Sequence, residues 1–445
     1  MRRRQFLSSV SLAFAGLRTA AAQQASCDIR TFSYGPLQQD PAGIIDLPEG
    51  FSYHAFSRTG ERMDDGYFVP SLHDGMGAFR GPDGLTILVR NHEVGAGATN
   101  AGPFLNNPEL YNRTDKSLIY DPGRGVAPSL GGTTTLVYDT RNKRVVRSYL
   151  SSTGMVRNCA GGETPWGTWI TCEETNQRAT GNFEKDHGYN FEIPARMEMG
   201  IEPPRPLIAM GRFNHEAIAV DPRTSIVYQT EDRGDGLFYR YIPNRPNSVI
   251  NGGNLQALAI RDRASFDTRN YTGRVMPLSQ TFDCYWVDIE DVTSPGDNLR
   301  AQGFAKGAAR FSRGEGIWTS REGFYFACTD GGQARKGQIF RYIPSPFEGR
   351  CEEERYPGKL ELFIEPNDGN LVDNADNLTV APWGDIYLTE DGPNPNFIVG
   401  VTPRGDTFAF GRNRVGAGAE MAGACFSPDG TTMFVNIQTP GITLA

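Results

Sequence analysis

The stretch GDIYLTED (384–391) has the pattern of a turn, a hydrophobic strand and an acidic end, and this motif is repeated along the chain. The further copies are GLTILVRNHE (84–93), GTWITCEE (167–174), TSIVYQTED (224–232), GFYFACTD (323–330) and GTTMFVNIQ (430–438). Another short strand begins eight to ten residues before each turn, at a polar or acidic residue: Asp74, Cys159, Glu216, Glu315, Asp376 and Glu420. Self-similarity of this kind indicates a repeat architecture. The sequence therefore predicts an all-β fold, a six-bladed β-propeller with four-stranded blades.

Residues 216–262 show the four strands of one predicted unit, at 216–222, 226–230, 237–242 and 255–260. The third strand recurs as NFEIP (190–194), FYRYIP (238–243), IFRYIP (339–344) and FIVGVTP (397–403). We expect proline to close each copy, because proline cannot donate to a sheet ladder. Other candidates for the fourth strand are VVRSYL (145–150), PLIAMG (206–211) and LELFIE (360–365).

The two ends of the repeat region predict how the ring closes. The last unit stops at 442–445 in its third strand, whereas 51–58 has strand character and no unit of its own. We expect these segments to pair, which would complete the C-terminal blade and remove an exposed edge. No linker divides the repeats, so the domains we predict are a signal peptide at 1–22, an extension at 23–44 and one catalytic propeller at 45–445.

Composition excludes several classes of protein. The 445 residues include 52 Gly and 29 Pro, which suits short strands joined by tight turns. Charged residues make up 22%, and no apolar run approaches about 18 residues, so a membrane-spanning chain is not expected. The formal charge of −8 disfavours nucleic acid and anionic membranes as partners and suits a protein that binds cations.

The N-terminus has the features of a targeting segment. Arg3-Arg4-Gln5-Phe6-Leu7 precedes an apolar stretch, and Ala20-Ala21-Ala22 offers a cleavage site of small residues. This pattern looks like a twin-arginine export signal, with an ordinary secretory signal as the alternative. It predicts that the twin-arginine export machinery delivers the folded protein to the periplasm or the extracellular space.

The repeated acids are predicted to converge. In an antiparallel pair, the start of one strand and the end of the next lie at the same edge. The expected pairs are Glu216 with Glu231, Asp74 with Glu93, Cys159 with Glu173 or Glu174, Glu315 with Asp330, Asp376 with Glu390 and Asp391, and Glu420 with Asn436 and Gln438. Carboxylates gathered at one channel mouth would repel one another unless cations neutralised them. Their oxygens suit Ca²⁺, whereas the thiolate of Cys159 indicates a transition metal in the same cluster.

Arg313 stands two residues before Glu315, so strand alternation places both on the same side. It could form a simple salt bridge within the cluster. It could also act as an anion clamp, because a guanidinium grips phosphate through two parallel hydrogen bonds. A metal cluster beside an arginine suits hydrolysis of an anionic ester.

Several motifs together resemble a known family. They are NCAGGETPWGTWITCEE (158–174), RNHE (90–93), NHEA (214–217), RGEG (313–316), ADNL (375–378) and FSPDG (426–430). From about residue 45 onward the chain is similar to the PhoX-type bacterial alkaline phosphatases. The resemblance implies a six-bladed propeller with a mixed iron–calcium cluster that hydrolyses phosphate monoesters. It further implies that Cys159, Glu216 and Glu315 hold iron or bridge it to calcium, that Arg313 binds the phosphate, and that Glu93, Glu174, Asp376 and Glu420 are further calcium ligands.

We therefore predict an exported, monomeric phosphoric monoester hydrolase whose substrate is a small phosphate ester. In the expected mechanism an oxide or hydroxide of the metal cluster attacks phosphorus, Arg313 clamps the phosphate, and Glu216 and Glu315 complete the catalytic site. One alternative is a calcium-dependent lactonase or other ester hydrolase, which would need the carboxylates but neither Cys159 nor Arg313. Another is a non-catalytic, calcium-stabilised propeller that binds partners.

Overall fold

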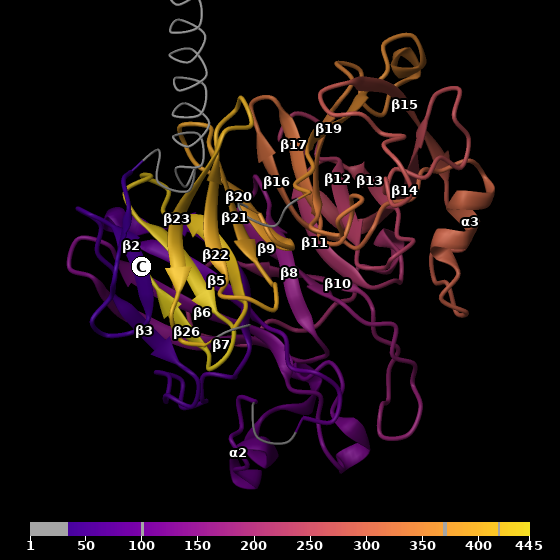
Figure 1. Cartoon of the computed structure of the whole chain (residues 1–445). Helices are drawn as coiled ribbons and strands as arrows, with labels where there is room; N and C mark the ends of the chain where they lie inside the picture. Colours follow the sequence, from indigo (N-terminus) through magenta and orange to yellow (C-terminus); the bar gives the residue numbers. More distant parts are fainter. Residues whose placement is uncertain (1–33, 99–101, 368–371, 417–418) are drawn as a thin grey trace, which may run out of the picture.

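The computed structural model describes residues 34–98, 102–367, 372–416 and 419–445, and these form an all-β architecture with a few short helices (Figure 1). The predicted signal peptide at 1–22 and the first half of the predicted extension at 23–44 lie outside the described residues. The α-helices of the described part are α2 (Pro108–Arg113) and α3 (Leu299–Ala305). Neither of them combines the length and the apolar character that crossing a bilayer requires.

The first two sheets follow the chain in order. One contains β4 (His73–Arg80), β5 (Thr86–His92), β6 (Gly131–Asp139) and β7 (Arg144–Met155), each antiparallel to the next. The next contains β8 (Asn158–Glu163), β9 (Thr168–Glu173) and β10 (Asn190–Pro194). Apart from β6, which none of the predicted segments covers, these strands overlap the repeats found in the sequence.

Two predicted units join into one nine-stranded sheet. In spatial order its strands are β11 (His215–Val220), β12 (Val227–Glu231), β13 (Phe238–Arg245), β14 (Ser248–Ile260), β15 (Thr281–Asp288), β19 (Lys359–Ile364), β18 (Gln338–Ile343), β17 (Gly323–Cys328) and β16 (Gly314–Ser320). The additional strand β15 pairs with both β14 and β19. Because a shared strand covers the outer edges of both units, neither edge is left open.

The remaining sheets contain the chain ends of the described region. One has the order β1 (Leu37–Gln38), β2 (Ile45–Pro48), β23 (Thr407–Asn413), β22 (Phe397–Val401), β21 (Ile386–Glu390) and β20 (Ala375–Val380). The other has the order β24 (Met421–Phe426), β25 (Met433–Ile437), β26 (Ile442–Leu444) and β3 (Ala55–Arg58). The predicted pairing of the two ends is present, because β3 lies antiparallel to β26 with Thr443 opposite Phe56.

The first strand of each unit faces the centre of the molecule. β4 packs against β8, β8 against β11, β11 against β16, β16 against β20, β20 against β24, and β24 against β4. These contacts form a closed ring of inner strands. The close approach depends on small residues: a Cβ added at Gly162 of β8 would lie 2.0 Å from the carbonyl oxygen of Ile218 in β11.

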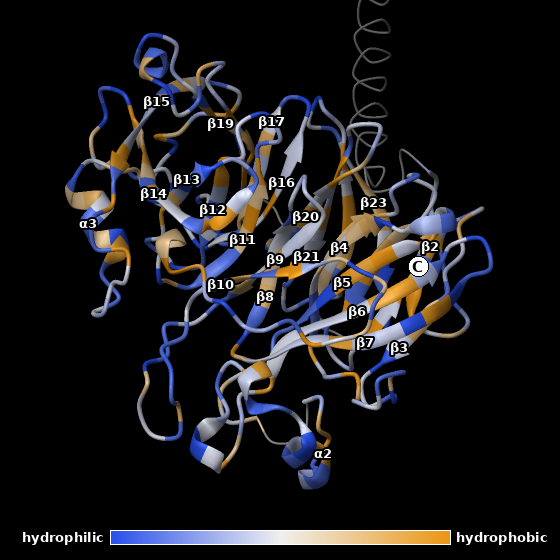
Figure 2. Cartoon of the chain, turned by 180° about the vertical axis from the view of Figure 1, so that it is seen from behind, coloured by the Kyte–Doolittle hydropathy of each residue, from blue (hydrophilic) through white to orange (hydrophobic). Residues whose placement is uncertain are grey.

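Hydrophobic side chains fill the spaces between neighbouring sheets. Figure 2 shows hydrophobic residues along the strands and mostly hydrophilic residues in the loops. Between the two halves of the nine-stranded sheet, the rings of Phe238 and Phe326 stack with centroids 4.4 Å apart. Burying a phenylalanine side chain stabilises a fold by about 1.5–3 kcal/mol, so these layers hold the inner strands in place.

Two predictions about strands are wrong. The segment 206–211 is no fourth strand: Ile208–Met210 forms a short 3-10 helix, and Pro206 makes only an isolated bridge to Phe191. Prolines at 203, 204 and 206 remove the donors that a strand would need there. Proline also fails to end one third strand, since β13 continues past Pro243 to Arg245 with a register shift.

Candidate functional site

A local irregularity recurs where the inner strands begin. The register with the second strand shifts between His73 and Met76, Asn158 and Gly161, His215 and Ile218, Gly314 and Ile317, Ala375 and Asn377, and Ala422 and Cys425. Asp74, Cys159, Glu216, Glu315 and Asp376 lie inside these shifts. A β-bulge re-aims the side chain at the irregular position and is frequent beside active sites. The bulges therefore orient the repeated polar residues.

The structure brings all seven predicted metal-binding residues together at one mouth of the ring. Three groups have potential ligand atoms within 4.8 Å of one another: Cys159, Glu174 and Glu216; Glu216, Glu315 and Asp376; and Asp74, Glu93 and Glu420. Glu216 belongs to two of these groups and therefore connects them. Asp74, the remaining residue at the start of an inner strand, completes the third.

Most of the donors are buried, Glu93 and Glu420 only partly so, and their charges interact. Burial, and then the charges of Asp232 and Asp376, raise the pKa of the Glu315 carboxyl well above its usual range. Burial and the neighbouring Asp391 raise the pKa of Asp376 to about 7. Burial also raises the pKa of the Cys159 thiol.

Carboxylates held this close are costly to ionise unless cations accompany them. Carboxylate oxygens suit Ca²⁺, and a thiolate suits a transition metal. The donor set therefore fits a cluster of metal ions.

Where two acids end a second strand, the second of them faces the cluster. Glu174, Asp232 and Asp391 act electrostatically on the cluster carboxylates, and Glu174 also lies among the potential ligands. The preceding residue points away, which corrects the expected pairing of Glu216 with Glu231. Glu231 accepts hydrogen bonds from the Leu237 amide and the Tyr239 hydroxyl. Alternation along a strand explains the difference, because successive side chains point to opposite faces.

The expected pairing of Glu315 with Asp330 is also wrong, since Asp330 contacts the hydroxyls of Tyr271 and Ser312. Asp232 takes its place beside Arg313. The Nε and Nη2 of Arg313 donate to the two carboxylate oxygens of Asp232 at 2.8 and 3.1 Å, and Nη2 also donates to Glu315 at 2.9 Å. Arg313 is thus fixed by two acids, while 40% of its side chain stays exposed at the mouth.

Sequence reasoning missed Arg157, which occupies the corresponding place in another unit. Its Nη2 forms an ion pair with Glu93 at 2.8 Å and donates a hydrogen bond to Glu174. The missed signal was the spacing, because Arg157 precedes Cys159 by two residues just as Arg313 precedes Glu315.

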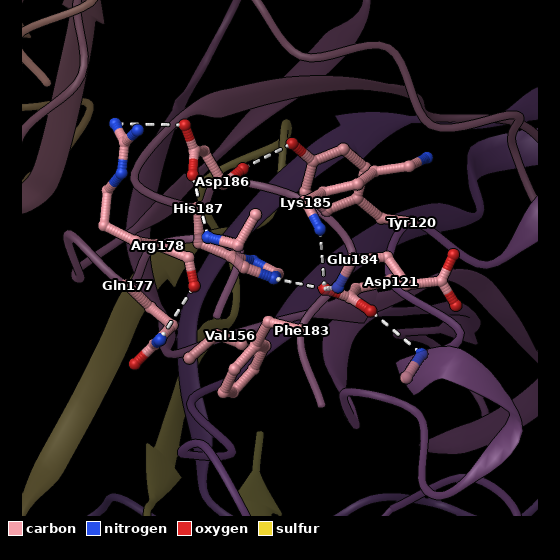
Figure 3. Close-up of polar contacts among 12 residues, drawn as sticks. Tyr120, Asp121, Val156, Gln177, Arg178, Phe183, Glu184, Lys185, Asp186 and His187 are labelled. Carbon is pink, nitrogen blue, oxygen red and sulfur yellow. Dashed lines mark hydrogen bonds and ion pairs between the residues drawn. The ribbon is translucent and has the colours of Figure 1, made fainter. Parts of the chain in front are cut away.

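A buried ion cluster anchors the segment before Cys159. The imidazole of His187 lies between Glu173 (Nδ1 to Oε1, 2.6 Å) and Asp121 (Nε2 to Oδ2, 3.2 Å), and all three side chains are fully buried. Figure 3 shows His187 directed at Asp121. Glu173 also accepts a hydrogen bond from the amide of Val156 at 2.9 Å. The loops that carry Asp121 and His187 are thereby connected, through Glu173, to Val156, the residue before Arg157.

The segment around Trp169 supports Cys159 from the other side. The indole Nε1 of the buried Trp169 donates to Asn91 Oδ1 at 2.9 Å. Asn91 in turn donates through Nδ2 to the carbonyl oxygens of Cys159 and Ala160, at 3.0 and 2.6 Å. These bonds hold the start of β8 in position without occupying the thiol.

Two cavities of about 830 and 360 Å³ lie elsewhere, and Trp383 lines both. Their walls include the turns at 221–223, 320–323 and 430–432, which join first to second strands. These turns lie at the opposite end of the inner strands from the cluster, so neither cavity contains a predicted site residue.

Comparisons with known proteins agree with this arrangement of residues. A family model described as alkaline phosphatase PhoX matches residues 32–441. The chain belongs to the alkaline phosphatase PhoX family. Its fold is similar to that of Pseudomonas fluorescens PhoX, solved in complex with vanadate, a transition state analogue. The TM-score is 0.65 at 16% identity, covering 94% of this chain and 98% of that chain.

Other likenesses are weaker. The periplasmic gluconolactonase of Pseudomonas aeruginosa matches with a TM-score of 0.41 at 14% identity, covering 87% of this chain and 90% of that chain. No curated protein sequence matches the chain. Membership of the PhoX family makes this protein an alkaline phosphatase, a class of phosphoric monoester hydrolase.

Proposed function

We propose that the protein hydrolyses small phosphate monoesters at the buried cluster, with Arg313 binding the phosphate. The family match over residues 32–441 carries the proposal. Its structural support is a mouth that gathers carboxylates, one thiol and an arginine from separate sheets. With cations bound to these donors, such a site would offer positive charge to a substrate that carries negative charge.

We propose a six-bladed propeller as the architecture of residues 45–445, which act as one catalytic domain. Six inner strands in a closed ring of contacts support this proposal. The pairing of β2 with β23 and of β3 with β26 ties the beginning of this region to its end. The sheets depart from a uniform four strands where β8–β10 form three and where β15 joins two units.

The proposed cofactors are iron and calcium. Cys159, Glu216 and Glu315 would hold iron or bridge it to calcium, and Glu93, Glu174, Asp376 and Glu420 would bind calcium. The mixture of one thiol with hard oxygen donors supports two kinds of metal. When bound, such metals supply Lewis-acid stabilisation of the phosphoryl oxygens and lower the pKa of water.

The chain's own residues position the substrate. Arg313 would place donors on the terminal oxygens of the phosphate, and Asp232 fixes its guanidinium by accepting from Nε and Nη2. A preorganised donor costs no reorganisation when charge develops in the transition state. Burial of Glu216 and Glu315 keeps competing water away from the centre of the cluster.

Cys159 and Arg313 argue against the two alternatives. A calcium-dependent lactonase requires no thiol donor, and a binding propeller requires no arginine fixed between acids at the mouth.

For the cellular context, we propose export by the twin-arginine machinery to the periplasm or beyond, as a monomer. The Arg3-Arg4 motif supports the route.

Activity and metal content together test the proposal. The exported protein should hydrolyse p-nitrophenyl phosphate, and a chelator should remove both metal and activity. Arg313→Ala should lower kcat/KM on the order of a hundredfold or more with metal retained, as for loss of a transition-state donor. Glu315→Gln should lose metal as well. Full activity of a metal-free preparation would exclude the mechanism.

A further inference from the structure

Arg157 and Arg313 occupy equivalent positions around Glu216. Each stands two residues before a cluster residue at the start of an inner strand, Cys159 of β8 and Glu315 of β16. Each has a left-handed backbone, with φ of 52° at Arg157 and 48° at Arg313. β8 and β16 both pack against β11, which carries Glu216. The two arginines therefore flank Glu216 from neighbouring strands.

The contacts of Arg157 leave most of its donors available. In the described part of the chain only Nη2 contacts acidic side chains: it forms an ion pair with Glu93 at 2.8 Å and donates a hydrogen bond to Glu174. Nε and Nη1 have no acceptor among the described residues, and 44% of the side chain is exposed. A guanidinium carries five N–H donors in a planar fork that matches phosphate oxygens. Arg157 thus presents an unused part of this fork at the mouth.

The backbone around Arg157 is held rigidly. Its amide donates to the Val94 carbonyl at 3.0 Å, and its carbonyl accepts from the Glu174 amide at 2.9 Å. Glu173, which His187 holds in place, binds the amide of the preceding Val156. Energetically unfavourable left-handed conformations persist where surrounding contacts impose them, and they are concentrated at functional sites. The backbone position from which the Arg157 side chain extends is therefore fixed.

We propose that Arg157 is a second phosphate-binding residue, which contacts the substrate from the side of Glu216 opposite to Arg313. The inference rests on the proposed phosphatase function and adds a residue to its substrate site. A phosphate monoester has three terminal oxygens, more than one guanidinium can satisfy with two parallel hydrogen bonds. Two arginines that directly precede β8 and β16, the strands on either side of β11, would provide donors to oxygens on both sides of the phosphorus.

A different role would be charge neutralisation alone, in which Arg157 only offsets Glu93 and Glu174. The two roles differ in what a charge-conserving variant does. Arg157→Lys keeps the positive charge beside both acids but loses the planar fork. Under the binding role this variant weakens phosphate binding and retains metal. Under neutralisation alone it behaves like the unchanged protein.

The experiment compares Arg157→Gln and Arg157→Lys with Arg178→Gln in the full-length exported protein. Arg178 is a matched control, because it is 46% exposed and pairs with one acid, Asp186, at 3.1 Å (Figure 3). The readouts are KM for p-nitrophenyl phosphate, the inhibition constant of inorganic phosphate, and bound metal by elemental analysis.

We expect both constants to rise on the order of tenfold to a hundredfold in Arg157→Gln, the effect of losing one or two charge-assisted hydrogen bonds. Arg157→Lys should show a smaller rise at unchanged metal content, and Arg178→Gln none. Unchanged constants in Arg157→Lys together with parallel loss of metal and activity in Arg157→Gln would overturn the inference. If the unchanged protein neither hydrolyses the ester nor binds phosphate, the proposed function itself fails.

Discussion

Replacement of His187 by glutamine should make stability depend on pH in a defined way. Burial alone lowers the pKa of His187, but the Glu173 charge and the hydrogen bonds that the imidazole donates to both acids outweigh burial and raise it to about 9. The ordinary value is 6.5. A shift of about 2.5 units corresponds to about 3 kcal/mol of stability in favour of the protonated, folded state.

The sign follows from the raised pKa. Below about pH 6.5 the imidazole is protonated in both the folded and the unfolded chain, so the contribution is complete. It declines as the pH rises and is lost above about pH 9, where the folded state also releases the proton. The advantage of the unchanged protein over His187→Gln should therefore be largest near pH 6 and smallest near pH 10.

Denaturant unfolding at pH values from 6 to 10 measures this difference. His54→Gln is the control, because His54 contacts the hydroxyl of Tyr138 instead of a carboxylate. Subtracting each variant from the unchanged protein cancels other groups that titrate in this range. A His187→Gln difference that stayed constant over the whole range, or grew with pH, would show that the folded state does not raise the pKa of His187.

Three further variants test packing and the metal donors. Cys159→Ser should lose most of its iron while retaining calcium, checked by elemental analysis, and retention of both metals would contradict the proposed role of the thiol. Gly162→Ala should destabilise the fold by about 1–3 kcal/mol, because its Cβ would lie 2.0 Å from the Ile218 carbonyl oxygen, and urea unfolding measures the loss. Ile442→Ala, in the strand that meets β3, should cost about 2–4 kcal/mol by the same measurement; a neutral result would show that the closure contributes little.

Much of the fold could be predicted from the sequence because the same strand pattern recurs several times along the chain. The repeated motif that ends at Glu390-Asp391 predicted where second strands end. The polar residues upstream of each motif predicted where inner strands begin. Both follow from antiparallel pairing within each unit. The seven predicted ligands converge because the same offset recurs in every unit.

Features set by neighbouring segments could not be predicted in this way. The loss of a fourth strand at 206–211 depends on local prolines, and the addition of β15 depends on an edge shared by two units. Whether Glu231 or Asp232 faces the cluster depends on the register between β11 and β12, which is irregular between His215 and Ile218. Only strand alternation counted from the bulge would have identified Asp232.

The site was predictable in its acids and less so in its arginines. The carboxylates could be predicted because they recur at the same position in several repeats. Arg157 stands two residues before the polar residue of its inner strand, and only Arg313 has the corresponding position in another repeat. Its partners Glu93 and Glu174 come from two different second-strand ends. That contact exists only after the inner strands have come together in space.

The most direct measurement of the central claim is an anomalous-scattering map from crystals of the exported protein. We expect metal peaks within about 2.0–2.6 Å of donor atoms of Cys159, Glu216 and Glu315, with further peaks beside the outer carboxylates. An ordered mouth whose thiol and carboxylates surround only water, in protein that still hydrolyses the ester, would contradict it.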